Sequence, residues 1–332
     1  MAIRTLKRRD FLRCAGGGAL AVSLTPAMSR AAQPTLSVVA TTSMIADAAR
    51  QVGGDLVSVR ALMGPGVDPH AYRQTRTDIL ALTRSDLALW HGLYLEAQME
   101  EFFLDLAARR RVVAVGESVP RDKLLSHEEY EGRFDPHVWM DPRLWADVVE
   151  GVREALTQAQ PDGADVFRAN AAAHLAEIDE LAAYADGVLA TVPEPARVLL
   201  SAHDAFNYFG RAYGFEVLGV QGISTEAEAG LRRVEELVSL LVEREVKAVF
   251  VESSVSDRNV RALIEGAAAR GREVSIGGEL YSDAMGPVGS YEGTYLGMID
   301  HNVTTIARAL GGEAPARGMR GALSAIQQEA SK

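Results

Sequence analysis

The sequence predicts an α/β protein with two similar lobes, each a parallel sheet flanked by helices, joined by one long rigid helix. Two observations support this fold class. Short β-rich runs alternate with helical patterns along most of the chain, an order typical of parallel sheets covered by helices on both faces. The alternation stops over residues 162–193, where neither glycine nor proline occurs between Gly163 and Gly187, and then begins again.

The first lobe is predicted over residues 33–161, where four apolar runs have the length of buried strands. These runs span residues 36–40, 57–62, 87–90 and 112–115. Helical patterns cover residues 44–52 and a stretch that ends near Arg84, after the loop Gly64-Pro65-Gly66.

The linking helix is predicted over residues 162–193, which are rich in alanine, leucine and glutamate, all strong helix formers. Thirty helical residues would extend about 45 Å, longer than most helices within one domain. The alternative is a long surface helix inside a single domain. We favour a link because the alternation restarts in residues 194–332, the predicted second lobe. Its strands are expected at residues 198–200, 216–220, 248–251 and 273–276.

Residues 1–32 are predicted to be a twin-arginine signal peptide. Arg8 and Arg9 precede Phe11, a weakly apolar run follows, and small residues near Ala31 offer a cleavage site. We therefore expect a periplasmic protein, exported in a folded state. Cys14 is the only cysteine and lies in this segment. The mature chain would then have none, which excludes disulfide scaffolds, zinc ribbons and thiol catalysis.

The charge of the chain excludes one class of partner. The net charge is −11, and removing residues 1–32, with six basic and one acidic side chain, leaves 28 basic and 44 acidic side chains, a net of −16. Such a body repels phosphate backbones, so we expect no nucleic-acid partner. No stretch after the signal reaches transmembrane length, and we expect a soluble monomer.

Two of the seven histidines follow the same dipeptide, in Asp68-Pro69-His70 and Asp135-Pro136-His137. Proline fixes its own φ and biases the preceding residue towards extended geometry, so each imidazole is presented from a stiff loop. The neighbouring aspartate could orient a ring nitrogen, as metal-bound histidines usually require. Asp-Pro is also a common turn dipeptide, and the duplication is what favours a metal site.

Two further candidates lie just past predicted strands of the second lobe, where open α/β sheets bind their ligands. His203 follows the run 198–200, and Asp283 follows the run 273–276. Two ligands from each lobe would place a metal in the cleft between them. His174 and His301 fall on helical patterns, where we expect surface or packed histidines.

Three imidazoles and a carboxylate suit borderline divalent cations, since calcium and magnesium prefer oxygen ligands alone. Zinc lies above manganese in the affinity order. Manganese would accept the same set if Asp283 bound through both oxygens. The residue types by themselves leave both metals open.

The region from about residue 36 to residue 310 resembles the TroA-type zinc- and manganese-binding proteins of ABC importers. The similarity rests on the combination and order of five motifs: Val67-Asp68-Pro69-His70, Asp135-Pro136-His137-Val138-Trp139-Met140-Asp141-Pro142, Ser201-Ala202-His203-Asp204-Ala205-Phe206, Gly219-Val220-Gln221-Gly222-Ile223-Ser224-Thr225 and Gly278-Glu279-Leu280-Tyr281-Ser282-Asp283-Ala284-Met285-Gly286. The resemblance implies two α/β lobes bridged by one helix and delivery of the metal to a membrane ABC permease. It also implies the ligand set His70, His137, His203 and Asp283.

Two departures from the family pattern bear on the metal. Many zinc-specific relatives have a histidine-rich acidic loop between the first two ligands, whereas residues 117–133 contain only His127. Manganese-selective relatives often have a carboxylate where this chain has His203. The first departure argues against zinc and the second argues for it. Taking both together we favour zinc, with manganese as the alternative.

Two other functions compete with metal delivery. A zinc hydrolase would use the same ligands, with Glu279 as its base, but catalytic zinc keeps an open position that four protein ligands would fill. A binding protein for a non-metal solute would need aromatic platforms or basic clamps. The chain has only three tryptophans and no arginine cluster near the candidate ligands.

Overall fold

A computed structural model describes residues 35–126 and 131–324, which belong to one compact unit. The predicted signal segment 1–32, Cys14 and His127 lie outside these residues. Among the helices described, none is both long and apolar enough to cross a membrane.

The first lobe is built on a four-stranded parallel sheet with the strand order β2-β1-β3-β4. Its strands are β1 (Leu36–Ala40), β2 (Val57–Ala61), β3 (Leu87–Trp90) and β4 (Val112–Ala114). Its helices are α1 (Ser43–Gly53), α2 (Arg76–Arg84), α3 (Glu100–Ala107) and α4 (Pro142–Ala159). Successive strand residues point to opposite faces: Val38 packs with α1 and α4, and Val39 packs with α2 and α3.

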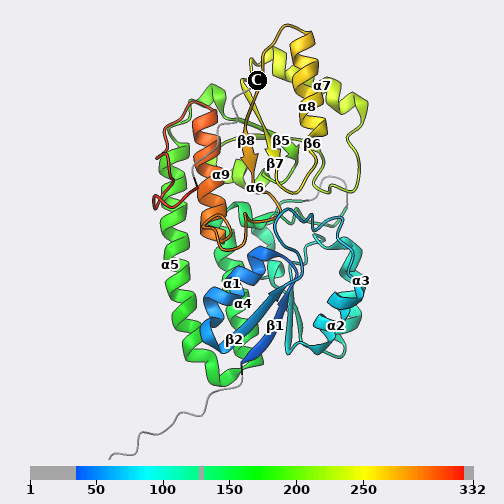
Figure 1. Ribbon diagram of the computed structural model, residues 1–332, viewed down its shortest axis with the longest axis vertical. Helices are drawn as coiled ribbons and strands as arrows, with labels where there is room; N and C mark the ends of the chain where they lie inside the picture. Colours follow the sequence, from blue (N-terminus) through cyan, green and yellow to red (C-terminus); the bar gives the residue numbers. More distant parts are fainter. Residues whose placement is uncertain (1–34, 127–130, 325–332) are drawn as a thin grey trace, which may run out of the picture. The chain divides into compact units, whose positions relative to one another are not determined.

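The second lobe repeats this strand order in two parallel pairs, β6-β5 and β7-β8, with β5 against β7 (Figure 1). The sequence predicts one sheet here, and the structure divides it into two hydrogen-bonded pairs that lie side by side. The strands are β5 (Val198–His203), β6 (Glu216–Gln221), β7 (Ala248–Glu252) and β8 (Ser275–Leu280). The helices are α6 (Asn207–Tyr213), α7 (Leu231–Glu243), α8 (Arg258–Ala269) and α9 (Tyr295–Ala309).

Strand β8 lies further along the chain than the predicted run 273–276. The pair Gly277-Gly278 has the composition of a strand end, but the β7–β8 register shifts at this point, with Val249 opposite Ile276 and Phe250 opposite Gly278. Such a bulge lets a strand continue past glycine. The strand therefore extends to Leu280, three residues before Asp283.

The long helix α5 (Ala164–Leu189) confirms the predicted bridge and is slightly shorter than the predicted range. Its 26 residues extend about 39 Å. It packs against α1 and α4 of the first lobe and against α9 of the second (Figure 1). The two lobes therefore rest on one common helix.

The largest of three apolar clusters among the described residues extends across both lobes. The largest cluster of buried side chains includes Val38 of the first sheet together with Leu199 and Phe250 of the second. Within it, the rings of Trp145 in α4 and Tyr295 in α9 stack at a centroid distance of 5.0 Å. Because close-packed interiors deform little, this shared core resists a large rotation of one lobe against the other.

Candidate metal centre

The first-lobe candidates lie in loops that end where a capped helix begins. His70 is in the connection between β2 and α2, and α2 begins only at Arg76 because Thr75 and Asp78 form a capping box there. His137 precedes α4, which begins with Pro142 at its first position and Asp141 as its N-cap. In both cases the capping residues keep the histidine loop out of the helix.

The second-lobe candidates lie at the carboxyl ends of strands. His203 is the last residue of β5, and Asp283 follows the end of β8. Trp139 of the first lobe donates its Nε1–H to the carbonyl of Ser282 at 2.7 Å, which fixes the segment that contains Asp283.

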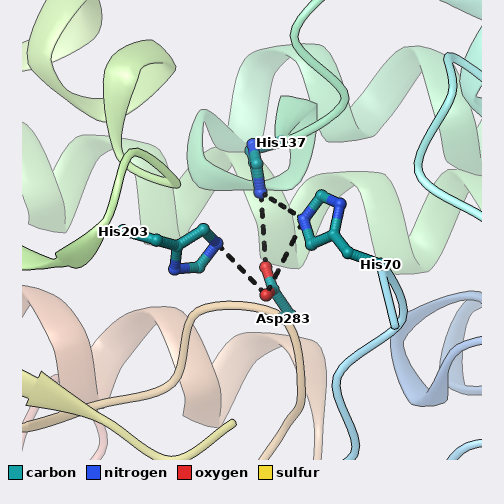
Figure 2. A group of neighbouring side chains, drawn as sticks. All are labelled: His70, His137, His203 and Asp283. Atoms are coloured by element: carbon teal, nitrogen blue, oxygen red, sulfur yellow. Dashed lines mark hydrogen bonds and ion pairs between the residues drawn. The ribbon is translucent and has the colours of Figure 1, made fainter. Parts of the chain in front are cut away.

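The four candidates converge on one point, as Figure 2 shows. One ligand atom from each lies within 4.8 Å of all the others, and all four side chains are buried. The Nε2 atoms of His70 and His137 are 3.2 Å apart. Asp283 oxygens lie 3.2 Å from His203 Nε2 and 3.4 Å from His137 Nε2. Four ligands at zinc bond lengths of about 2.0–2.1 Å would be about 3.3–3.5 Å apart. These three distances lie near that range, whereas His70 Nε2 and Asp283 Oδ2 are 3.9 Å apart, so a bound metal would draw the ligands closer together.

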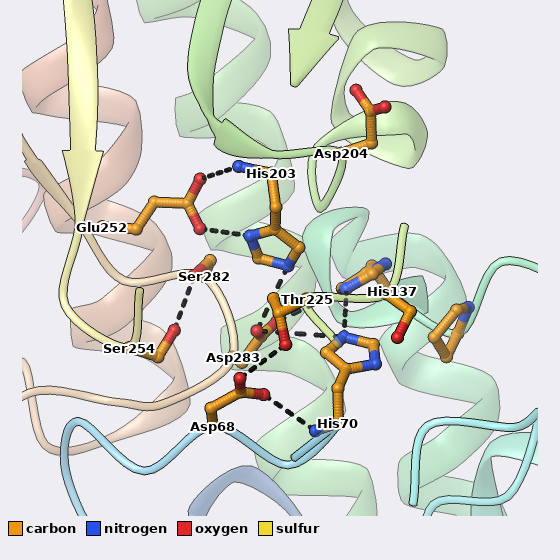
Figure 3. Close-up of polar contacts among 12 residues, drawn as sticks. Asp68, His70, His137, His203, Asp204, Thr225, Glu252, Ser254, Ser282 and Asp283 are labelled. Atoms are coloured by element: carbon orange, nitrogen blue, oxygen red, sulfur yellow. Dashed lines mark hydrogen bonds and ion pairs between the residues drawn. The ribbon is translucent and has the colours of Figure 1, made fainter. Parts of the chain in front are cut away.

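Carboxylates behind two of the imidazoles set their orientation, as Figure 3 shows for Glu252 and His203. Asp135 Oδ1 is 2.8 Å from His137 Nδ1, and Glu252 Oε2 is 2.5 Å from His203 Nδ1. Each carboxylate accepts the Nδ1–H and thereby leaves Nε2 as the atom that faces the centre. This carboxylate–histidine arrangement is the one usually found around metal-bound imidazoles.

The charges of the centre are strongly coupled. Burial alone would lower the pKa of His137, but the carboxylates of Asp135 and Asp283 together outweigh burial and raise the pKa to about 9. Burial would also lower the pKa of His203. The carboxylates of Glu252 and Asp283 nevertheless raise this pKa well above its ordinary value. Burial would raise the pKa of Asp283, whereas the surrounding imidazoles hold it well below the usual range. A divalent cation would have to displace protons from these imidazoles, because only the neutral ring can bind it.

The hydrogen bonding of the four residues also fits a metal ion. Among the described residues, His203 Nε2 and both carboxylate oxygens of Asp283 are buried and make no hydrogen bond, although they form ion-pair contacts within the group. Buried polar atoms are normally hydrogen-bonded, so atoms that face only one another around a common point suit a ligand there. A cation bound by all four residues would satisfy them together.

Three further residues singled out in the sequence lie outside this group. His174 is packed in α5, as expected, and His301 in α9 is bonded to the Glu279 carbonyl at 2.9 Å. Glu279, the base considered for a hydrolase, is exposed, unlike the four buried candidate ligands.

Two supporting residues are missing from the sequence predictions. Glu252, which orients His203, ends strand β7, and the rule that ligands gather at strand ends could have found it. Buried His91 donates its Nε2–H to the Pro136 carbonyl at 2.7 Å, and burial lowers the pKa of this histidine to about 3, so it is neutral. Nothing local in the sequence signals that contact, because the two residues are 45 positions apart.

Comparisons with known proteins agree on the family to which the chain is similar. The family model described as "Zinc-uptake complex component A periplasmic" (ZnuA) matches residues 38–309. The manganese-binding lipoprotein MntA of Bacillus subtilis (strain 168) is 47% identical over 286 residues, 86% of this chain and 93% of the relative. The zinc-binding protein TroA of Treponema pallidum (strain Nichols) is 47% identical over 273 residues, 82% of this chain and 88% of the relative. A solved structure of the Treponema pallidum periplasmic zinc-binding protein TroA superposes with a TM-score of 0.81 at 46% identity, covering 83% of this chain and 99% of that one.

Proposed function

Because this chain belongs to the family of periplasmic zinc-uptake components, the metal-binding proteins of ABC importers, we propose that it captures zinc in the four-residue centre and delivers it to a membrane permease. The membership confirms the resemblance predicted from the motifs. The family consists of substrate-binding transporter components, not enzymes, and so excludes the predicted hydrolase alternative. The observation that most supports the proposed centre is the group of buried, unsatisfied ligand atoms at His203 and Asp283.

Zinc is our choice on the chemistry of the donors. Three imidazoles and one carboxylate are a donor set that suits zinc, which also lies above manganese in intrinsic affinity. Manganese prefers more ligands, which Asp283 could supply by binding through both oxygens. Sequence similarity does not decide between the two metals, since the Bacillus relative is named for manganese and the Treponema relative for zinc at the same 47% identity.

Release is proposed to proceed through local movements of loops and ligands with modest rotation of the lobes. Helix α5 contacts both lobes, and the apolar core is continuous between them. We propose boundaries that place the lobes at residues 33–161 and 194–332 and the link at residues 162–193. On this division the two lobes pack against each other and against the link. We also propose that the protein acts as a monomer.

Export by the twin-arginine route to the periplasm remains part of the proposal. It rests on Arg8 and Arg9 and on the small residues near Ala31. The Bacillus relative is named a lipoprotein, whereas Cys14 of this chain precedes the apolar run and follows Arg13, an unsuitable setting for a lipid anchor. Folded export would allow zinc to be bound in the cytoplasm. Metal-free protein recovered directly from the periplasm would argue against that step.

A metal competition tests the proposed function. Mature protein is stripped of metal and offered equimolar zinc and manganese, and the bound metal is measured by elemental analysis. We expect one equivalent of zinc, lost in His203→Ala because a ligand is removed, and kept in His174→Ala, the matched control. Retention of manganese would reassign the cargo. No stoichiometric binding of either metal would refute the function.

A further inference from the structure

Asp68 connects a candidate ligand of the first lobe to the second lobe. Its Oδ1 accepts the backbone N–H of His70 at 2.8 Å, and its Oδ2 accepts the hydroxyl of Thr225 at 2.5 Å (Figure 3). Thr225 is 157 residues away in sequence, in the segment that follows β6. One half-buried carboxylate thus joins the backbone of His70 to the opposite side of the centre.

The position of Thr225 is fixed from within the second lobe. Gln221 is the last residue of β6 and lies opposite His203 in the strand register. Its side-chain amide donates to the carbonyls of Thr225 at 3.2 Å and Ala227 at 2.9 Å. The paired ends of β5 and β6 therefore contribute to the centre in different ways. Strand β5 supplies the candidate ligand His203, and strand β6 supplies Gln221, which holds the residue that contacts Asp68.

We propose that Thr225 is a positioning residue which, through Asp68, holds His70 in the centre and slows release of the metal. The inference rests on the proposed function and names a residue that limits the release step. Asp68 and His70 share a short loop stiffened by Pro69, so a shift of the His70 backbone away from the second lobe would break the Thr225–Asp68 bond. A hydrogen bond to a carboxylate is among the stronger kinds, which makes this bond a substantial part of the barrier.

A second contact crosses between the lobes nearby and supplies a control. Gln98 donates its Nε2–H to Glu226 Oε1 at 2.6 Å, one residue beyond Thr225. Both side chains of this pair lie in exposed surroundings, and neither is bonded to the backbone of a ligand. Exposed polar contacts contribute little, so loss of this bond should leave release almost unchanged.

The test compares release rates of zinc-loaded full-length mature protein. Each variant is mixed with excess EDTA, and release is followed through the change in tryptophan fluorescence, to which Trp139 contributes because its ring lies 5.2 Å from the His137 ring. Association is measured separately by mixing stripped protein with zinc. Thr225→Val removes the hydroxyl at nearly constant shape, and Thr225→Ala checks that the added methyl is not the cause. We expect release about tenfold faster or more in both variants, with association within about twofold of the parent.

Two further variants decide whether the hydroxyl is responsible. Thr225→Ser keeps the donor and should restore slow release, and Gln98→Ala should behave like the parent protein. Parent-like release in Thr225→Val, fast release in Thr225→Ser, or equal acceleration by Gln98→Ala would overturn the inference. If the parent protein itself binds no zinc, the proposed function has failed instead, so the two failures are distinguishable.

Discussion

Residues 68–70 and 135–137 share the tripeptide Asp-Pro-His but differ in how the surrounding protein holds them. Asp135 is fully buried and accepts both the backbone N–H and the ring Nδ1–H of His137, at 3.0 and 2.8 Å. Asp68 is half-buried, accepts the backbone N–H of His70, and extends its other oxygen to Thr225.

The second lobe also contacts the two loops differently. At residues 135–137, Asn207 donates to the Asp135 carboxylate at 3.1 Å, and the Tyr208 hydroxyl donates to the Asp135 carbonyl at 2.7 Å. Both donors are on helix α6, which fixes their positions. Thr225, by contrast, lies in an irregular segment outside the helices and strands. Identical tripeptides therefore yield a firmly held candidate ligand at His137 and, under the proposal above, the candidate ligand that moves during release at His70.

The largest expected effect comes from removing each imidazole in turn. His137→Ala should lower zinc affinity by orders of magnitude, because it deletes one of four ligands from a framework that is already ordered. His70→Ala should lower it less, since part of the binding energy of His70 offsets the ordering of its loop. Competition with a calibrated chelator measures both. Equal losses would mean that the two loops are equally well ordered before the metal binds.

The next effect concerns the stability of the metal-free protein. Asp135→Ala leaves buried donors without an acceptor and should lower the free energy of unfolding by about 3 kcal/mol. Asp68→Ala affects a half-buried loop and should lower it by about 1 kcal/mol. Urea unfolding of the stripped variants provides the comparison. A larger loss for Asp68→Ala would reverse our ranking of the two loops.

The smallest expected effect is on the dimensions of the molecule. If release depends on a loop rather than on domain closure, the radius of gyration should change very little when zinc binds, because the lobes share one core and one helix. Small-angle scattering of stripped and zinc-loaded protein measures this. A large contraction would show that whole lobes close, in which case the difference between the loops would not govern release.

Local patterns were sufficient for much of the fold. Strand–helix alternation predicts the parallel sheets, and the run without glycine or proline between Gly163 and Gly187 predicts helix α5. The four candidate ligands were also identified in this way, from the repeated Asp-Pro-His loops and from residues at strand ends. These signals are visible because turn chemistry and periodicity act over a few neighbouring residues.

Tertiary structure alone decided which residues distant in sequence support those candidate ligands. Glu252 meets His203 across 49 residues, His91 meets Pro136 across 45, and Thr225 meets Asp68 across 157. It also decided that Asp135 orients an imidazole ring while the same residue type at position 68 joins a backbone to the other lobe. Sequence determines which groups a loop offers. Their partners depend on the packing of distant strand ends against one another, which no local pattern encodes.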